Sequence, residues 1–437
     1  MTPKFTGQSV LIIGNGNSGL EMAASIYGST NFVHITSKSR IKLSWETHYV
    51  GDIRGVNNEV IDSYMLKSLD GFFEVNINNL QIKKRTDGSN KLDILPTDGS
   101  WKGNFAERVP TREGYDRIIA CTGFKWDKAI FSQKSPISDS KLKVKDYWKP
   151  IKKRVYQTKI SDKYPLINHD YQSADYPGLY FLGTVSHSLD FRKSAGGFIH
   201  GFRYSVRALH KILEYRNHGI MWPSKIRKID QLVSSILNRA NEASGLYQMF
   251  GHLCDIAIVD KMNKTFTYLE EYPVNLLPHI LKYTGHEFDP DENKLFVLTL
   301  EYGKKFSEPG ADHFSRNRAV LDNPANESNF LHPIIYFYDD RIPNNQQFAE
   351  KSVDNSLPEP DDIHHVYEDF TTIFDGPNVH IKPLRRFVEK CLDLDLKMHL
   401  SDGCVTEDMA SGKRVQTCER FFESDEPSVN SYAANER

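Results

Sequence analysis

The sequence predicts an α/β protein, with a helix-covered parallel sheet in its N-terminal part and an α+β region in its C-terminal part. An apolar run, Ser9–Ile13, is long enough for a buried parallel strand, and a helix pattern, Ser18–Ser29, follows it after a glycine-rich turn. A second apolar run, Tyr115–Cys121, also ends in a turn of small residues. The 437 residues, 39% hydrophobic and 26% charged, are enough for two or three ordinary globular domains.

Three glycines in the first turn, Gly14, Gly16 and Gly19, have the spacing G-x-G-x-x-G between a strand and a helix. There the first glycine allows a tight turn, the second lets the backbone approach a pyrophosphate, and the third brings the helix close to the sheet. The pattern therefore predicts a Rossmann-like dinucleotide site, and a purely structural glycine turn is the alternative. The predicted contacts are Gly14, Gly16, Asn17, Ser18, Gly19 and Glu21.

The next strand pattern, Phe32–Ser37, indicates which dinucleotide is bound. An NAD site usually has an acidic residue at the end of this strand to accept from the ribose 2′-hydroxyl. Here Ser37 is followed by Lys38 and Arg40, and no acid occurs before Glu46. Basic side chains suit the 2′-phosphate of NADPH, so Ser37, Lys38 and Arg40 are predicted to bind it. A solvated basic turn is the alternative.

Further strands and turns are expected along the chain. Short alternating stretches between Phe72 and Pro96 predict antiparallel strands with a turn at Asp87-Gly88. After Tyr115–Cys121, the turn Thr122-Gly123 lies where a doubly wound sheet closes over its ligand. The run Pro177–Gly183 predicts another buried strand, and Ala195-Gly196-Gly197 precedes a long helix, Phe198–Arg216.

Three domains follow from these patterns: a nucleotide-binding domain over 1–124, a second segment over 125–216, and a region of its own over 217–437 with a disordered tail. In the last region the sequence predicts helices at Ile229–Phe250 and Leu384–Leu394, strands at Leu295–Leu300 and Pro333–Tyr338, and a Pro- and Asn-rich loop at Asn344–Asp362. Tyr247, Met249 and Phe250 are expected in its core.

Composition excludes several kinds of function. A net charge of −2 argues against a nucleic-acid binder, and no apolar run approaches the ~20 residues of a membrane span. The five cysteines form no C-x-x-C pair, and His364-His365 matches no metal-ligand spacing, so a solvated loop is expected there and no metal site. Cys391, Cys404 and Cys418 could form one disulfide. Sequons at Asn263 and Asn326 point weakly to a secretory location.

Three stretches in this order, GNGNSGLE, ACTGF and PGLYFLGTVSHSLDFRKSAGGFIHGF, resemble the superfamily of flavin-containing monooxygenases and glutathione-reductase-like enzymes. In that superfamily an NADPH domain is inserted into a discontinuous FAD domain. The resemblance therefore implies a Rossmann-like NADPH domain inserted in an incomplete FAD domain, with residues 125–216 as the C-terminal FAD half. Here Cys121 replaces the usual alanine, and Gly183-Thr184 replaces the usual Gly-Asp, which puts the ribityl contact in doubt.

The resemblance implies that the protein uses FAD and NADPH as cofactors. The additional contacts are Thr122 and Gly123, Gly183, and the segment Ser194, Ala195, Gly196, Gly197 and Phe198 beside the isoalloxazine ring. No catalytic side chain is identified. Cys121 is either a redox thiol or a small buried residue, and His187, His200 and Arg203 either line the flavin or cap and face a helix.

The stretches LSWETHYVGDIR, NEASGLYQMFG and FLHPIIYFY extend the resemblance, from about Phe5 to Leu394, to an endoplasmic-reticulum branch of this superfamily. It implies a lumenal protein in the disposal of misfolded glycoproteins, with the degradation machinery and lumenal disulfide reductases as partners. Members carry a signal peptide, a first FAD half and a retention tetrapeptide. This chain lacks that pattern at both ends, so we expect a truncated relative that holds FAD weakly.

Three functions are consistent with these observations. The leading hypothesis is a flavin oxidoreductase in which NADPH reduces FAD, with an unidentified acceptor. Monooxygenation is a variant of it. The size of the C-terminal region, which contains no catalytic pattern, instead favours a non-catalytic adaptor of the degradation machinery.

Overall fold

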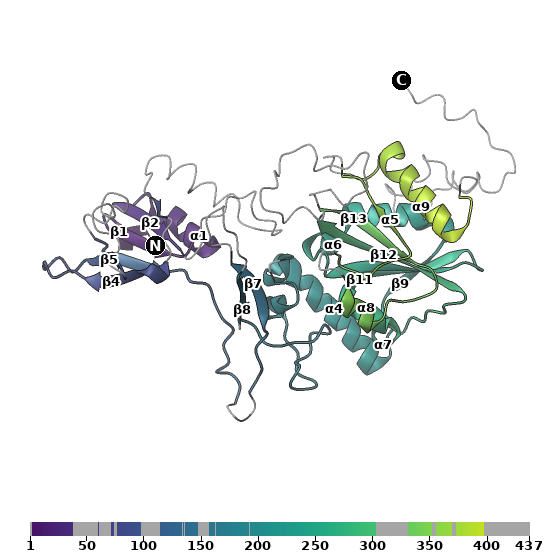
Figure 1. The fold of residues 1–437 in the computed structure, drawn as a ribbon, viewed down its shortest axis with the longest axis horizontal. Coiled ribbons are helices and arrows are strands. Elements are labelled where there is room, and N and C mark those ends of the chain that lie inside the picture. The colour runs from purple at the N-terminus through teal and green to yellow at the C-terminus, as the bar shows by residue number, and fades with distance from the viewer. Residues whose placement is uncertain are drawn as a thin grey trace, which may run out of the picture. The chain divides into compact units, whose positions relative to one another are not determined.

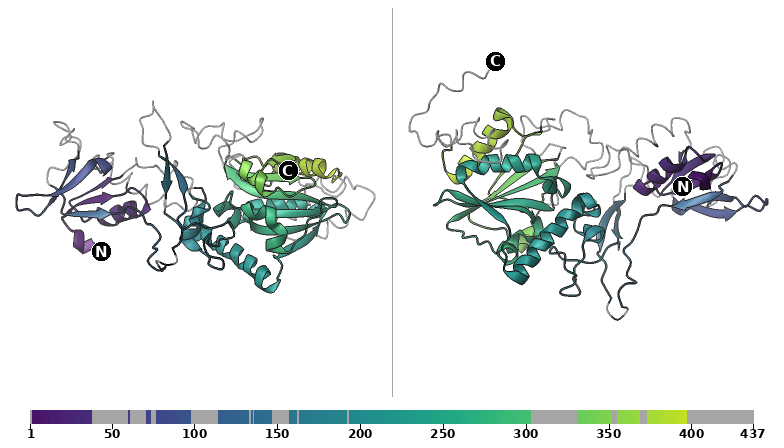
Figure 2. Two further views of the ribbon diagram at one scale, coloured as in Figure 1. Left: turned by 60° about the horizontal axis from the view of Figure 1, so that its bottom comes forward. Right: turned by 180° about the vertical axis from the view of Figure 1, so that it is seen from behind.

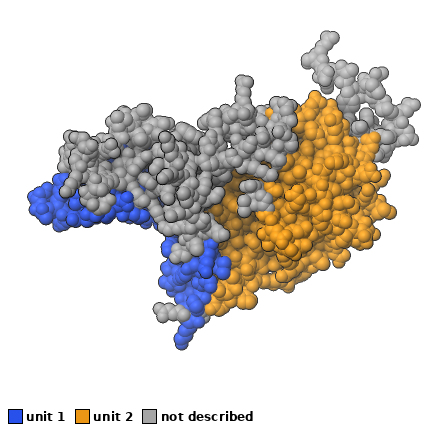
Figure 3. All heavy atoms as spheres, in the orientation of Figure 1, with its two compact units in different colours: residues 1–166 blue, residues 167–437 orange. Residues whose placement is uncertain are grey.

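The computed structural model describes residues 2–37, 60, 71–73, 77–97, 114–132, 134, 136–146, 157–161, 163–191, 193–302, 331–351, 355–368 and 373–396. The chain forms two compact units, residues 1–166 and 167–437, coloured separately in Figure 3. The boundary falls inside the predicted 125–216 segment, and the three predicted domains stay a prediction. The two units are described one at a time.

Unit 1 is built on a four-stranded sheet in the order β3-β2-β1-β6. Figure 1 labels β1 and β2 of this sheet. Its strands are β1 (Ser9–Ile13), β2 (Phe32–Thr36), β3 (Phe72–Phe73) and β6 (Arg117–Ala120), and all neighbours are parallel. Helix α1 (Asn17–Ile26) connects β1 to β2. The predicted first strand, first helix, second strand and Tyr115–Cys121 strand are therefore confirmed.

Both faces of this sheet are covered, which explains why Val10–Ile13 is apolar throughout. Val10 and Ile12 pack with Leu20, Ala23 and Ile26 of α1 on one face. On the other face Leu11 packs with Ile94 and Tyr115. Ile94 belongs to a hairpin of β4 (Leu80–Lys84) and β5 (Leu92–Pro96), which confirms the expected turn at Asp87-Gly88. A second hairpin pairs β7 (Leu142–Asp146) with β8 (Gln157–Ser161).

Unit 2 is organised around a six-stranded antiparallel sheet in the order β14-β13-β12-β10-β11-β9. Figure 1 labels four of its strands, β9, β11, β12 and β13. Its strands are β9 (Ser224–Lys228), β10 (Leu253–Asp260), β11 (Thr265–Pro273), β12 (Asn293–Tyr302), β13 (Leu331–Tyr338) and β14 (Asp362–His365). Its helices are α4 (Ile199–His218), α5 (Leu232–Glu242), α6 (Ser244–Gln248), α7 (Ile280–Thr284), α8 (Asn345–Glu350) and α9 (Lys382–Leu392). The described fold is thus mixed α/β, with one parallel and several antiparallel sheets.

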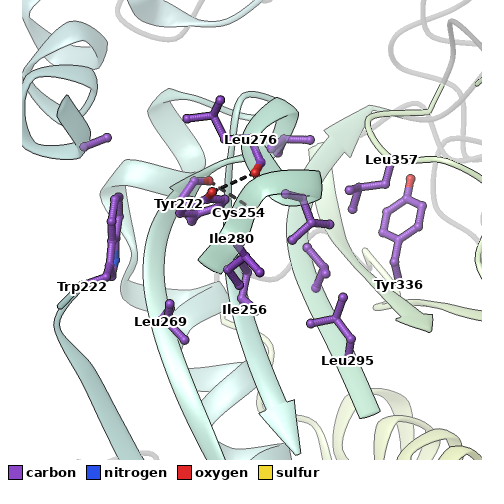
Figure 4. Close-up of a cluster of buried hydrophobic side chains, with 14 of the residues drawn as sticks. Trp222, Cys254, Ile256, Leu269, Tyr272, Leu276, Ile280, Leu295, Tyr336 and Leu357 are labelled. Carbon is purple, nitrogen blue, oxygen red and sulfur yellow. Dashed lines mark hydrogen bonds between the residues drawn. The ribbon is translucent and has the colours of Figure 1, made fainter. Parts of the chain in front are cut away.

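Helices cover both faces of the unit 2 sheet (Figure 2). Helix α4 packs Ala208, Leu209 and Ile212 against the face that carries Ile256 and Leu269. Figure 4 shows this core, in which the Tyr272 hydroxyl donates to the Leu276 carbonyl at 2.8 Å. Helices α5 and α9 lie on the opposite face. Burial of each large aliphatic side chain contributes about 1.5–3 kcal/mol, so this core fixes the position of α4.

Several sequence-based expectations are wrong in unit 2, three of which concern its strands, loops and core. The run Pro177–Gly183 forms no strand, because its ladder contact is one isolated bridge, from Tyr180 to Gln172. The expected loop at Asn344–Asp362 contains α8, which begins with a capping box between Asn344 and Gln347. Tyr247 is half exposed, whereas Met249 and Phe250 are buried as expected.

Candidate functional site

The glycine-rich turn gives each of its three glycines a distinct geometric role. Gly14 has φ +119°, and a Cβ there would overlap the carbonyl oxygen of Cys121. A Cβ on Gly19 would overlap the carbonyl oxygen of Gly14, so only glycine lets α1 approach the turn this closely. Gly16 has nothing within 4 Å of its Cβ position. The turn is therefore tight at its two ends and open in the middle.

The turn lies at a switch point of the parallel sheet. Strand β1 has β2 on one side and β6 on the other, so the chain order reverses at β1. Backbone hydrogen bonds join the three strand ends, from Gly14 N–H to the Thr36 oxygen and from Cys121 N–H to the Ile13 oxygen, both 2.7 Å. The crevice outside the carboxyl ends of the strands at such a point is the usual ligand site of open α/β sheets.

These strand ends bring together predicted contacts that lie more than a hundred residues apart in sequence. Ser37 follows Thr36 and is buried, and Thr122 and Gly123 follow Cys121 and are exposed. Asn17 is half-buried at the first position of α1, and Ser18 and Glu21 are exposed on it. Lys38 and Arg40 lie outside the described residues.

The surroundings of Cys121 favour a structural residue over a redox thiol. It packs at the edge of the core formed by β1, β2 and α1, and it is free of any disulfide. Burial raises the pKa of its thiol, which disfavours the reactive thiolate. Cys391 is also a free thiol, and Cys404 and Cys418 lie outside the described residues.

The second predicted contact segment, Gly183–Phe198, lies in unit 2 and folds around Asp190. This buried carboxylate accepts hydrogen bonds from the Gly196 N–H at 2.8 Å and from the Ser194 hydroxyl. His187 Nδ1 lies 2.7 Å from its other oxygen. Burial raises the pKa of Asp190, but the hydrogen bonds from His187 and Ser194 outweigh burial and leave that pKa lowered. Sequence reasoning missed Asp190.

Packing within this segment explains why residues 196 and 197 are glycines. A Cβ on Gly196 would overlap the carboxylate of Asp190, and one on Gly197 would come within 3.0 Å of the His187 ring. Gly183 differs, since it has φ +77° and open space around its Cβ position. Thr184 donates its hydroxyl to the Gly197 oxygen at 3.3 Å, which joins the two ends of the segment.

The other residues that the sequence singled out divide between inward and outward positions. His187 is buried against Asp190 and makes an edge-on contact with Phe191. His200 is exposed near the start of α4, and Arg203 lies over the Tyr204 ring at 4.8 Å. His187 therefore supports its own loop, whereas His200 and Arg203 face outward on α4.

Among the described residues, no cluster of three or more His, Cys, Asp or Glu side chains could hold a metal ion. The His364-His365 pair forms part of β14, which corrects the expected solvated loop. His364 stacks on Phe387, and His365 Nδ1 lies 3.0 Å from His332 Nε2. None of the helices that the structure describes is long and apolar enough to cross a membrane.

Two curated proteins match almost the whole chain, whereas no protein-family model matches it. FAD-dependent oxidoreductase domain-containing protein 2 of Mus musculus is 46% identical over 433 residues, 96% of this chain and 61% of the relative. The protein of the same name from Danio rerio is 37% identical over 454 residues, 96% of this chain and 62% of the relative. The chain is therefore a homologue of the proteins named FAD-dependent oxidoreductase domain-containing protein 2, and spans about three fifths of their length.

Proposed function

We propose that unit 1 binds NADPH at the turn between β1 and α1 and that the chain is part of an FAD-dependent oxidoreductase. One observation carries the first half of this proposal. A glycine turn, tight at Gly14 and Gly19 and open at Gly16, lies at the switch point of a parallel sheet. The open space at Gly16 suits a pyrophosphate, and the first N–H groups of α1 suit its charge.

The assignment of the second cofactor rests on the relatives and on the segment Gly183–Phe198. The relatives are named for FAD dependence. The open left-handed Gly183 leaves room for a ligand, whereas Gly196 gives its N–H to Asp190. We therefore place the flavin beside Ser194–Phe198 through the surface of that segment rather than through the Gly196 N–H. A bound flavin supplies hydride acceptance from NADPH, and this chain supplies binding and orientation.

The cellular setting is part of the same proposal. We place the protein in the lumen of the endoplasmic reticulum, in the degradation of misfolded glycoproteins, with the degradation machinery and lumenal disulfide reductases as partners. The sequon at Asn263 supports a secretory compartment, because Asn263 is exposed at the tip of the β10–β11 hairpin. An endoglycosidase-sensitive mass shift that disappears in Asn263→Gln is the expected result, and an unshifted wild-type protein argues against lumenal exposure of this hairpin.

The dinucleotide site is tested by Gly16→Ala. The backbone of Gly16 (φ −84°, ψ −177°) accepts alanine, and the added methyl enters open space, so unit 1 should fold. The same methyl stands where a pyrophosphate would approach, and we expect NADPH binding, followed by nicotinamide fluorescence, to weaken about 100-fold, or about 2.8 kcal/mol. Gly28→Ala is the matched control, since Gly28 also has open space. Equal NADPH affinity in the two variants would falsify the site.

Cofactor choice is tested by replacing Lys38 and Arg40 together with serine. Losing two charge-assisted contacts to the 2′-phosphate should weaken NADPH binding about 10- to 100-fold. NADH lacks this phosphate, so its affinity should stay within about twofold of the wild-type value. A parallel loss of both cofactors would contradict the assignment to NADPH, and a visible flavin band that bleaches with NADPH would support hydride transfer.

A further inference from the structure

The segment Ser194–Phe198, which leads into helix α4, is held in place by hydrogen bonds to one buried carboxylate, that of Asp190. Asp190 accepts hydrogen bonds from two points of the segment, the Ser194 hydroxyl and the Gly196 N–H. Between them Ala195 is fully buried, and its carbonyl accepts from the Phe198 N–H at 3.0 Å. Phe198 is the residue that precedes the first turn of α4. Asp190 is therefore connected to the start of α4 by two successive sets of hydrogen bonds. The first joins Asp190 to Ser194 and Gly196, and the second joins Ala195 to Phe198.

Close packing makes this connection stiff. A Cβ on Gly201, in the first turn of α4, would overlap the backbone of Ala195 and would come within 2.7 Å of the Met249 sulfur. His187 contacts the other oxygen of the Asp190 carboxylate, and its ring lies next to Gly197. Because each neighbour of Asp190 is itself packed, the loop has little freedom to re-form around a different side chain.

We propose that Asp190 is the positioning residue of the flavin-side segment, fixing Ser194–Phe198 in its binding geometry before any cofactor arrives. This inference rests on the proposed function, which places the flavin beside the same segment. Asp190 touches no cofactor in this arrangement and acts through Ser194 and Gly196. The Thr184 hydroxyl, bonded to the Gly197 oxygen, ties Gly183 into the same preformed geometry.

The test compares Asp190→Asn and Ser194→Ala with the wild-type chain. Asp190→Asn removes the charge that strengthens both hydrogen bonds, so it should weaken FAD binding about 10- to 100-fold, and Ser194→Ala should fall between it and wild type. In the cofactor-free protein, amide hydrogen exchange over residues 194–202 should accelerate in the same order. Asp291→Asn, an exposed aspartate of unit 2, is the matched control.

Three readouts separate the outcomes. Weaker FAD binding, a shifted absorption band of the bound flavin and unchanged NADPH binding support the proposal. A lower melting temperature with wild-type FAD affinity and an unshifted band means that Asp190 only stabilises the fold, and overturns it. A wild-type chain that binds NADPH but takes up no added FAD overturns the flavin part of the proposed function, and the positioning role with it. Ser194→Ala keeps the comparison valid if Asp190→Asn fails to fold.

Discussion

Gly19→Ala is expected to unfold the nucleotide-binding part of unit 1, although alanine is the better helix former. Within an exposed helix, replacing glycine by alanine stabilises by about 1 kcal/mol. Here the added Cβ would overlap the carbonyl oxygen of Gly14, and Ile12 lies directly beneath. Because the carbonyl belongs to a turn that is itself packed against Cys121, neither side can retreat. We expect a net loss of about 3 kcal/mol or more.

Amide hydrogen exchange of β1 and β2 measures this loss of stability in unit 1. Gly28→Ala, in the turn just after the same helix and in open space, makes the same chemical change without a clash and should leave protection unchanged. Wild-type protection in Gly19→Ala would mean that α1 does not pack on the turn as described, and the tight geometry of the candidate site would then be wrong.

The glycine turn was predictable from sequence because its signal is local. Gly14, Gly16 and Gly19 lie between an apolar strand and an amphipathic helix, and that spacing alone fixes the close approach of α1 to β1. The capping box of α8 was equally local, since Asn344 precedes Gln347 in the N-x-x-Q pattern, but the prolines and asparagines around it led to the prediction of a loop.

Features that depend on distant partners were not predictable. Pro177–Gly183 has the composition of a buried strand, yet a strand requires a neighbour, and within the described residues Tyr180 has one bridge. The order of the unit 2 sheet places β9 beside β11 although β10 lies between them in sequence. No periodicity reveals such a pairing.

The Gly196-Gly197 pair illustrates why the candidate site was only partly predictable. Glycines at a helix start, taken alone, are more often a simple turn than a ligand site, and it was the family resemblance that favoured a ligand here. In the fold, the side chains of Asp190 and His187 occupy the space that these glycines leave open. A sequence pattern shows that a Cβ is forbidden but does not say which atoms forbid it.

Acid is expected to destabilise both units well above the pKa of ordinary carboxylates, because three histidines, two buried and one half-buried, are neutral in the fold. Burial lowers the pKa of His34, His252 and His364 to about 4 each. A histidine in the unfolded chain titrates near 6.5, so between pH 6.5 and 4 the unfolded state binds more protons and stability falls as pH falls. At pH 5 each histidine contributes a loss of roughly 2 kcal/mol relative to pH 7.5.

Two fully buried carboxyl groups of unit 2 have pKa values shifted in opposite directions, and they act in different pH ranges. Burial raises the pKa of Glu301, so the folded state takes up its proton more readily and Glu301 partly offsets the histidines in unit 2. The pKa of Asp190 is lowered, so its contribution is lost only below the pH at which an ordinary aspartate protonates. Both of these carboxyl groups belong to unit 2, so unit 1 should follow His34 most closely.

Amide hydrogen exchange at pH 7.5 and pH 5, corrected for the intrinsic exchange rate, measures the loss of stability of each unit separately. The amides of β1 report the effect of His34 on unit 1, and the amides of β10–β12 report the stability of unit 2. His34→Gln and His252→Gln remove a titrating ring from their units and should flatten the pH dependence there by roughly 2 kcal/mol each. His218→Gln, an exposed histidine of α4, is the control and should leave it unchanged. An acid response as steep in His34→Gln as in wild type would show that the burial of His34, and with it the packing of β2 against Tyr115, differs from this structure.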